Sequence, residues 1–265
     1  MSVETERNPR TAYEALAPYY DRFTAHHRYE AWTASIEALA RRHGVGGTRL
    51  LDLACGTGKS FAPFAARGWS VTACDVSPAM LARAADRAPA GVRLLERDIR
   101  ELEPVGAFDL VTALCDVANY LLGPDDLAAA FAGAAANLAP GGVLVFDANT
   151  LRSYRTFFAT TDVLDDGDLL LLWRGGADAA GFAEGDLAPG TLDAFERDGD
   201  GDGWRRTSGE HLQRHHGRAE LEAALAEAGL EVAGSYGQHL DGRIDEGADE
   251  DLHTKTLYVA TTVRR

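Results

Sequence analysis

The sequence predicts an α/β fold in which helices flank a mainly parallel sheet. Apolar, β-branched runs alternate with helix-like segments between residues 48 and 150, the order that builds βαβ units. The first run ends in a short glycine-rich turn at 55–58, a place where α/β sheets commonly bind ligands. Residues 151–214 break this order with alternating polar and apolar residues, which predicts an antiparallel β insertion after the fifth strand.

The first half of the core predicts two strand–helix units followed by a third strand. A strand over 50–53 enters the glycine-rich turn, and the β-branched run 69–74 predicts the second strand. Ser77 is expected to cap the following helix, with Pro78 in its first turn. The third strand is expected over 92–99.

The second half of the core continues the alternation. A fourth strand is expected over 108–115, and the next helix should begin near Asp125 or Asp126, either of which is a suitable cap. The turn at 140–142 leads into a fifth strand that ends at Asp147.

The insertion and the two ends of the chain complete the predicted organisation. Strands are expected over 169–173, 192–197 and 204–207, and the Asp/Gly-rich tip at 198–203 lacks the glutamate of a calcium loop. Apolar residues at helical spacing predict helices near the N-terminus and after the insertion. We therefore expect four parts. Residues 1–47 form a helical lid and residues 48–150 the ligand-binding core. Residues 151–214 form the insertion over the pocket, and residues 215–265 the C-terminal part of the core.

Composition excludes several kinds of partner. The chain has 265 residues, 46% of them hydrophobic, and a net charge of −15, which argues against nucleic acid and anionic membrane surfaces. It has no apolar run of membrane-spanning length and no signal-peptide core at its start, so we expect a cytoplasmic protein. The isolated Cys55, Cys74 and Cys115 are read as small core residues, and no metal is expected.

Two familiar glycine-rich loops are incompatible with residues 50–60. A P-loop requires glycine where Leu53 stands, so successive N–H groups would not surround a phosphate. A dinucleotide fingerprint fits Gly56 and Gly58 but requires a third glycine where Phe61 stands.

The same stretch, with four later segments, resembles the class I S-adenosylmethionine (SAM) dependent methyltransferases. Residues 52–58 are similar to the first motif of that family, and an acidic residue, Asp75, follows Gly56 by 19 residues. Asp98, the FDLV segment at 108–111 and the LxPGGxLxxD segment at 138–147 also agree in order. The resemblance implies a Rossmann-like, seven-stranded sheet of order 3-2-1-4-5-7-6 with an antiparallel last strand.

The resemblance also implies how SAM is held. Asp75 would accept the ribose hydroxyls, Asp98 the adenine amino group, while Met80 and Ile99 would lie against the adenine. Asp52, Cys55 and Gly56 would surround the methionine portion. The implied cofactor contacts are Tyr20, Arg28, Asp52, Ala54, Cys55, Gly56, Gly58, Asp75, Val76, Met80, Asp98, Ile99 and Leu114.

The N-terminal segment resembles the small-molecule branch of this family, which includes the aminosugar N-methyltransferases. The resemblance rests on the YDRF segment at 20–23 and on Arg28. There Tyr20 would point at the methyl-transfer site and Arg28 toward the SAM carboxylate; the alternative for Tyr20 is a packing aromatic. Those enzymes place a histidine in the loop after strand four, where this chain has Tyr120. This departure puts an aminosugar substrate in question.

Candidate acceptor residues lie in that loop and in the insertion. Tyr20, Tyr120 and His211 are the catalytic candidates, and Asp116, Asn119, Tyr120, Trp173 and His211 are the substrate-binding candidates. Each has a structural alternative, such as a helix-capping acid at Asp116 or a core tryptophan at Trp173. His215 and His216 are expected outside the pocket.

We therefore expect SAM-dependent methylation of an N or O atom of a small metabolite by in-line displacement, with S-adenosylhomocysteine as product. We expect the reaction to belong to secondary metabolism and the active form to be a monomer or homodimer. Two alternatives stay open at this point. One is a protein that binds SAM or S-adenosylhomocysteine without transferring a methyl group, and the other is a nicotinamide-dependent oxidoreductase.

Overall fold

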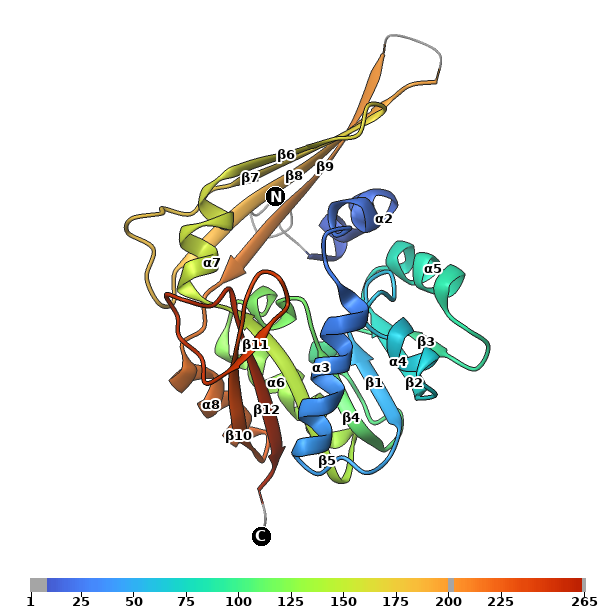
Figure 1. Ribbon diagram of the computed structural model, residues 1–265, viewed down its shortest axis with the longest axis vertical. Coiled ribbons are helices and arrows are strands. Elements are labelled where there is room, and N and C mark those ends of the chain that lie inside the picture. Colours follow the sequence, from blue (N-terminus) through green and yellow to red (C-terminus); the bar gives the residue numbers. More distant parts are fainter. Residues whose placement is uncertain (1–8, 200–202, 264–265) are drawn as a thin grey trace.

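The computed structural model describes residues 9–199 and 203–263. An eight-stranded sheet of order β11-β10-β12-β5-β4-β1-β2-β3 forms the centre of the molecule, and a four-stranded sheet of order β6-β7-β8-β9 lies above it (Figure 1). The strands of the central sheet are β1 Arg49–Leu53, β2 Ser70–Asp75, β3 Arg93–Glu96, β4 Phe108–Ala113, β5 Leu138–Asn149, β10 Leu230–Gln238, β11 Ile244–Glu246 and β12 Lys255–Thr262.

The predicted strand order is confirmed, with one addition. Strands β3, β2, β1, β4 and β5 are parallel neighbours, while β12 is antiparallel to both β5 and β10. The short β11 adds an eighth strand beside β10. Both faces of β1 and β4 are covered, which explains their almost uninterrupted apolar sequences.

Helices cover both faces of this sheet. On one face, α6 and α8 pack against Phe146 and its neighbours, and on the other face α3, α4 and α5 bury Ile36, Phe64 and Ala84. The chain therefore forms three layers, with a hydrophobic cluster on each face of the central sheet. These helices are α3 Tyr29–Arg42, α4 Ala62–Ala66, α5 Pro78–Arg87, α6 Pro124–Ala136 and α8 Arg218–Glu227, with the short turns η1 Ile99–Glu101 and η2 Val117–Tyr120.

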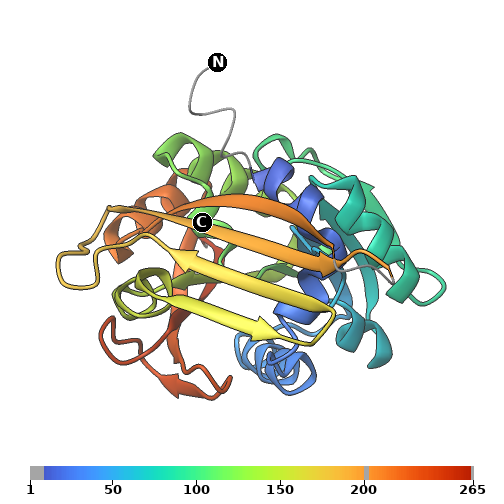
Figure 2. The same ribbon diagram turned by 90° about the horizontal axis from the view of Figure 1, so that it is seen from above.

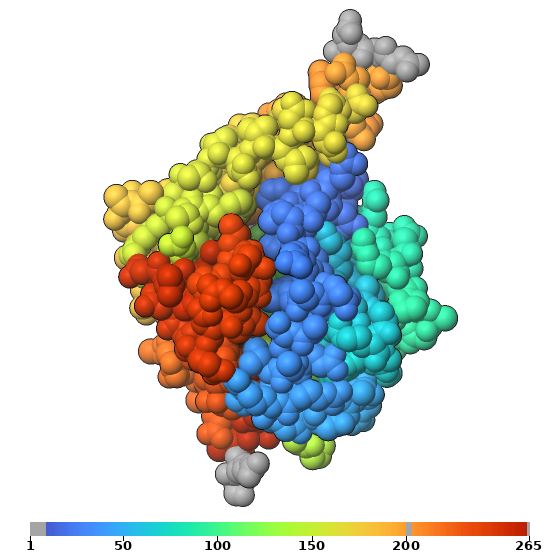
Figure 3. All heavy atoms as spheres, viewed as in Figure 1, coloured from blue at the N-terminus to red at the C-terminus, as the bar shows by residue number. Residues whose placement is uncertain are grey.

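The insertion lies across the carboxyl ends of the parallel strands (Figure 2). Helix α2 packs under it through Leu16 and Tyr19, which share a core cluster with Trp173 and Leu192. Figure 3 shows the N-terminal segment, in blue, directly beneath the insertion. The elements here are α2 Pro9–Phe23, α7 Leu151–Arg155, η3 Phe157–Ala159, β6 Thr161–Asp165, β7 Leu169–Gly175, β8 Leu187–Arg197 and β9 Trp204–Arg214.

The insertion strands extend further than predicted, because β8 and β9 pair along eleven residues each. A continuous antiparallel register lets the ladder run on through residues whose local pattern is not strand-like. The predicted hairpin tip falls partly on residues 200–202, which lie outside the described residues.

Two local predictions about helix starts have different outcomes. The Oγ atom of Ser77 accepts a hydrogen bond from the N–H of Met80 at 3.2 Å, so the predicted cap of α5 is confirmed. The prediction for α6 is wrong: Gly123 is the N-cap, and Asp125 and Asp126 lie in the first turn. There their charges favour the positive end of the helix dipole instead.

His215 and His216 do not line the large cavity beneath the insertion, as predicted, but both are buried in the core. They are 1% and 2% exposed, because the chain returns from the insertion to the core at this point, between α7 and α8. His216 Nε2 lies 2.9 Å from the carbonyl oxygen of Leu121, and His215 Nε2 lies 3.0 Å from a carboxylate oxygen of Glu250.

The three cysteines are free, and Cys55 and Cys74 are buried, as expected of small core residues. Among residues 9–199 and 203–263, no helix combines the length and the apolar character that a membrane span requires.

Candidate active site

The glycine-rich turn after β1 has a backbone that few other residues could adopt. The φ angles of Ala54, Gly56 and Gly58 are +51°, +55° and +82°, in the left-handed region that glycine tolerates best. A Cβ atom on Gly58 would lie 2.6 Å from the ring of Phe61. The phenylalanine that breaks the dinucleotide fingerprint therefore fills the space next to this glycine.

Asp75 ends β2 with its carboxylate turned toward this turn. One oxygen accepts the N–H of Gly56 at 2.8 Å, and the other accepts the N–H of Ser77 at 2.9 Å. Burial raises the pKa of Asp75, against the opposing effect of these N–H donors. An acidic group is thus held beside the loop, where the resemblance expects the ribose.

Asp52 supports the turn from below. It is 1% exposed, and its oxygens accept hydrogen bonds from Ser60 Oγ at 2.5 Å and Thr112 Oγ1 at 2.7 Å. Burial raises its pKa to about 6, although the two hydroxyl groups oppose this shift. Both carboxylate oxygens are therefore used in fixing β1, β4 and the loop together.

The remaining predicted cofactor residues are distributed around this turn. Met80 is buried in the first turn of α5, and Asp98 caps η1 while pairing with Arg100 at 2.6 Å. Cys55 and Leu114 are buried beside the turn and after β4. Arg28 precedes α3 and lines a smaller side cavity of about 330 Å³. Its predicted contact with the SAM carboxylate stays a prediction, as do the other cofactor contacts.

Helix α2 lies against the turn. A Cβ atom on Gly56 would lie 3.8 Å from the ring of Tyr20. Asp21 accepts the hydroxyl of Thr57 at 2.6 Å and pairs with Arg87 at 2.6 Å. The first helix of the described chain is therefore fastened to the loop and to α5.

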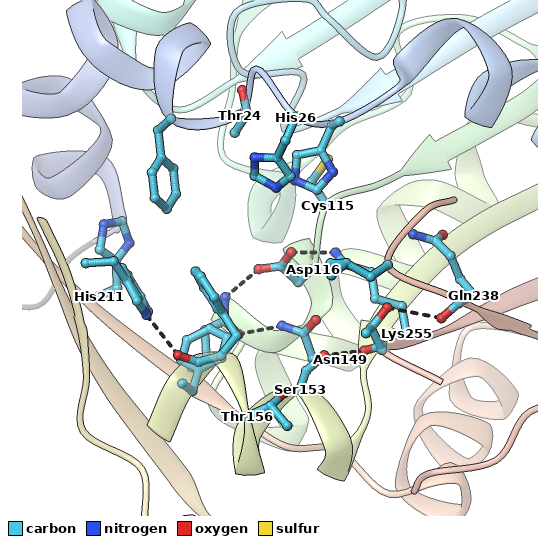
Figure 4. A pocket seen from close by; sticks show the side chains of 18 of the residues that line it. Thr24, His26, Cys115, Asp116, Asn149, Ser153, Thr156, His211, Gln238 and Lys255 are labelled. Atoms are coloured by element: carbon cyan, nitrogen blue, oxygen red, sulfur yellow. Dashed lines mark hydrogen bonds and ion pairs between the residues drawn. The ribbon is translucent and has the colours of Figure 1, made fainter. Parts of the chain in front are cut away.

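A cavity of about 1000 Å³ lies between α2, the insertion and the loop after β4. Figure 4 shows His211 on one side of it and Lys255 and Gln238 on the other, with Asp116 between them. The insertion and α2 supply an aromatic wall, and the central sheet supplies a polar floor. The wall and floor residues include Tyr13, Tyr20, Phe23, Phe157, Trp173, Asp116, Tyr120, Asn149, His211, Gln213 and Lys255.

The polar floor is built around Lys255 of β12. Its Nζ lies 2.5 Å from Asp116 and 3.2 Å from Asp147, and Gln213 donates to the second oxygen of Asp116 at 2.5 Å. Burial opposes the charge of Lys255, but the two carboxylates outweigh burial and raise its pKa. Burial raises the pKa of Asp147, and the nearby ammonium opposes that change.

The backbone is strained where it presents Asp116 to the cavity. Cys115 and Asp116 have φ angles of +66° and +57°, and Asp147 holds this conformation by accepting both of their N–H groups, at 2.9 and 2.5 Å. Left-handed backbone at a residue other than glycine costs free energy and often marks a functional site.

The aromatic wall contains a hydrogen-bonded chain. The hydroxyl of Tyr13 donates to that of Tyr120 at 2.9 Å, and the Tyr120 hydroxyl lies 3.0 Å from Nδ1 of His211. Burial lowers the pKa of His211 to about 4, against the influence of Asp116, so the ring is neutral at pH 7. Its Nε2 is buried and has no hydrogen-bond partner among the described residues.

Most predicted acceptor residues meet in this cavity. Tyr20, Asp116, Tyr120, Trp173 and His211 all line it. Asn119 was expected to bind substrate, and this prediction is wrong. It is fully buried, with its carboxamide donating to the carbonyl of residue 214 and accepting the N–H of residue 149, so it positions the loop instead of meeting substrate.

Several polar residues that the structure brings to the cavity were missed by sequence reasoning, and four of them belong to its polar floor or aromatic wall. Tyr13 comes from the lid, Asn149 from the end of β5, Gln213 from β9 and Lys255 from β12. Lys255 carried a usable signal, since it is one of two lysines in the chain. The other three had no local pattern that distinguished them.

His239, Asp245 and His253 form a cluster of metal-ligand composition beside β11. Nδ1 of His253 accepts the backbone N–H of Asp249 at 3.0 Å, so in the neutral ring the hydrogen is on Nε2, which faces Asp245. Hydrogen bonds account for this cluster, whereas a metal ligand would need a lone pair at that nitrogen.

Known proteins resemble the whole of this architecture. The sequence profile of the family described as "Methyltransferase domain" matches residues 50–142. The methyltransferase-family protein YqeM of Bacillus subtilis is 31% identical over 224 residues, which are 83% of this chain and 87% of YqeM. The chain belongs to the methyltransferase family.

Two further similarities concern the cofactor and a relative's substrate. A SAM-dependent methyltransferase from Clostridium acetobutylicum has a similar structure, with a TM-score of 0.76 and 25% identity over 94% of this chain and 98% of that one. The dTDP-3-amino-3,4,6-trideoxy-alpha-D-glucopyranose N,N-dimethyltransferase of Streptomyces venezuelae is 29% identical over 77% of this chain and 84% of its own. SAM is the cofactor of this methyltransferase.

The geometry of the methyltransferase fits SAM independently of these similarities. Gly56 carries no side chain on the side of the turn that faces Tyr20 of the lid helix, and the carboxylate of Asp75 is fixed beside this glycine. An acid at the end of the second strand suits the ribose hydroxyls. These residues would hold the cofactor.

Proposed function

We propose that the protein methylates the amino nitrogen of a small, sugar-like metabolite, in secondary metabolism. The observation that carries this proposal is the charge of the cavity floor. Asp116 and Asp147 share one ammonium, that of Lys255, so the three groups together carry one excess negative charge. Of the two carboxylates, Asp116 lines the cavity, where its side chain is 21% exposed. A protonated amine bound there would compensate the excess charge.

The reaction that follows is an in-line displacement. SAM supplies an electrophilic methyl group on a positively charged sulfur. The amine binds as an ammonium beside Asp116, loses its proton to solvent, and attacks with its lone pair. The N–C bond forms as the S–C bond breaks, and S-adenosylhomocysteine leaves. The protein contributes chiefly by positioning the reactants and excluding water.

The similarity to the sugar N,N-dimethyltransferase supports an amine acceptor. The cavity itself supports an acceptor with both polar and apolar faces. Its lining combines the charged floor with the rings of Trp173 and Phe157, which are stacked with their centroids 4.9 Å apart. A deoxygenated sugar has this character. Tyr20 and Tyr120 line the same cavity, and we expect them to lie near the transferred methyl group.

A second candidate, O-methylation, is favoured by one observation. His211 is neutral and its Nε2 has no partner among the described residues, which would suit a general base for a hydroxyl group if that nitrogen carried no hydrogen.

The replacement Asp116→Asn tests the proposal, because it removes the charge while keeping the size. We expect the KM for an aminodeoxyhexose to rise at least about tenfold, the effect of losing a hydrogen bond between charged groups, with little change in SAM affinity measured by calorimetry. The control is Asp241→Asn, an exposed carboxylate at the rim of the same cavity. A change in SAM affinity alone would mean that Asp116 faces the sulfonium, and an unchanged KM would refute the proposal.

A further inference from the structure

Three side chains from three separate elements form one chain of hydrogen bonds that ends in the cavity. Tyr13 belongs to the lid helix α2, Tyr120 to η2 after β4, and His211 to strand β9 of the insertion. Their rings also pack edge to face, with centroids 5.7 Å apart for the two tyrosines and 5.3 Å apart for Tyr13 and His211. Packing and hydrogen bonds therefore fix the same arrangement.

The direction of the hydrogen bonds determines where the imidazole carries its hydrogen. The Tyr120 oxygen accepts from Tyr13, so its own hydrogen requires an acceptor, and Nδ1 of His211 lies 3.0 Å away. A buried hydroxyl without an acceptor is costly. An Nδ1 atom that accepts has no hydrogen, and a neutral ring then carries its hydrogen on Nε2.

We propose that His211 presents this Nε2–H to an oxygen atom of the acceptor, and that Tyr13 and Tyr120 are positioning residues that hold the tautomer. The inference rests on the proposed function, because it takes the cavity as the acceptor site. The Nε2 atom lies in a residue that is 5% exposed, lines the cavity, and has no partner among the described residues. A buried donor of this kind requires an acceptor atom.

Two consequences follow for the substrate. The preferred acceptors are amines that carry a hydroxyl or ether oxygen near the methylated nitrogen, since this oxygen would meet His211 while the nitrogen faces Asp116. A neutral imidazole with hydrogen on Nε2 has no lone pair there, so His211 is not a general base in this tautomer. The hydrogen bonds from Tyr13 through Tyr120 to His211 thus favour an amine over a hydroxyl group as the nucleophile.

The tautomer can be measured on the full protein without any acceptor. Long-range 1H–15N correlation spectra of 15N-histidine-labelled protein at pH 7 distinguish the two neutral forms, and His211 is assigned by its loss in His211→Gln. We expect the Nε2–H form. The Nδ1–H form would overturn the inference, whatever the substrate proves to be.

The replacement Tyr120→Phe tests the link to the acceptor. Cis-2-aminocyclohexanol carries an oxygen next to its amine, and cyclohexylamine does not. We expect the KM of the amino alcohol to rise about 3- to 10-fold, the effect of one hydrogen bond, while kcat and the KM of cyclohexylamine change less. Tyr13→Phe should act in the same direction but more weakly.

The matched control is Tyr19→Phe, which removes a hydroxyl from the same helix. That hydroxyl donates to Glu196 on the insertion and does not line the cavity. Equal losses for both amines in Tyr120→Phe, or a matching loss in Tyr19→Phe, would contradict the positioning role. If neither amine is methylated while the Nε2–H form is found, the proposed function fails and the tautomer assignment stands.

Discussion

Lys255→Met should destabilise the protein more than any other conservative change at the cavity. The side chain of Lys255 is 12% exposed, and that of its partner Asp147 is fully buried. Removing the ammonium leaves Asp116 and Asp147 without their shared cation, although methionine fills a similar volume. Breaking a buried ion pair from one side costs about 3–5 kcal/mol, a large fraction of the roughly 5–15 kcal/mol that stabilises a typical domain.

Urea unfolding followed by circular dichroism measures this loss, and Lys59→Met is the matched control. Lys59 is the other lysine of the chain and donates to the carbonyl and hydroxyl oxygens of Thr24, at 3.0 and 2.9 Å. Its loss should cost about 1 kcal/mol, the value of ordinary hydrogen bonds.

A second replacement separates lost charge from lost packing. Asp116→Asn in the Lys255→Met background removes one of the two stranded carboxylates, and its amide oxygen can still accept from Gln213, so it should restore part of the stability, and the double-mutant cycle should show coupling. Lowering the pH should also reduce the effect of Lys255→Met, because stranded carboxylates can then be protonated. A loss below about 1 kcal/mol, or one that is independent of pH, would refute the ion-pair account.

Three further predictions concern the glycine-rich turn. Asp75→Ala removes the acceptor of the Gly56 N–H and the expected ribose contact, so the SAM dissociation constant should rise at least about tenfold by calorimetry; unchanged affinity would exclude that contact. Gly58→Ala places a Cβ 2.6 Å from the ring of Phe61 at φ +82° and should cost at least about 1–2 kcal/mol in urea unfolding; a smaller cost would show that the loop relaxes freely. Burial raises the pKa of Asp52 from 3.8 to about 6. The folded state thus holds this proton more tightly than the unfolded chain, so the stability it contributes is complete below about pH 4 and falls by about 3 kcal/mol as the pH rises through 6. Asp52→Asn should remove this fall, and a pH profile identical to that of the parent would contradict the assignment.

The fold could be predicted because its signals are local. The glycine turn at 55–58, the acid at Asp75 and the turn at 140–142 each mark a strand end within a few residues, and the strand order follows from the family that these motifs resemble. The cap at Ser77 depends on a contact only three residues away. The same kind of evidence was misleading at Asp125 and Asp126, since several suitable caps were adjacent.

The acceptor cavity could be predicted only in part, because its contacts join distant segments. Lys255 and Asp116 are separated by 139 positions, and Tyr13 and Tyr120 by 107, so no local spacing links them. Asn119 was expected to meet substrate because it stands in the right loop, but the direction of a side chain depends on tertiary packing. For the same reason His216, adjacent to a polar segment in the sequence, is buried in the structure.

The most direct test of the central claim identifies the atom that receives the methyl group. The full-length protein is incubated with SAM carrying a 13C-labelled methyl group and an equimolar mixture of an aminodeoxyhexose and the corresponding hexose, and the products are followed by 13C NMR. Methyl carbons bound to nitrogen and to oxygen have separate chemical shifts. We predict label on nitrogen alone, in an amount that falls in Asp116→Asn. Label on oxygen, or equal labelling of both sugars, would contradict it.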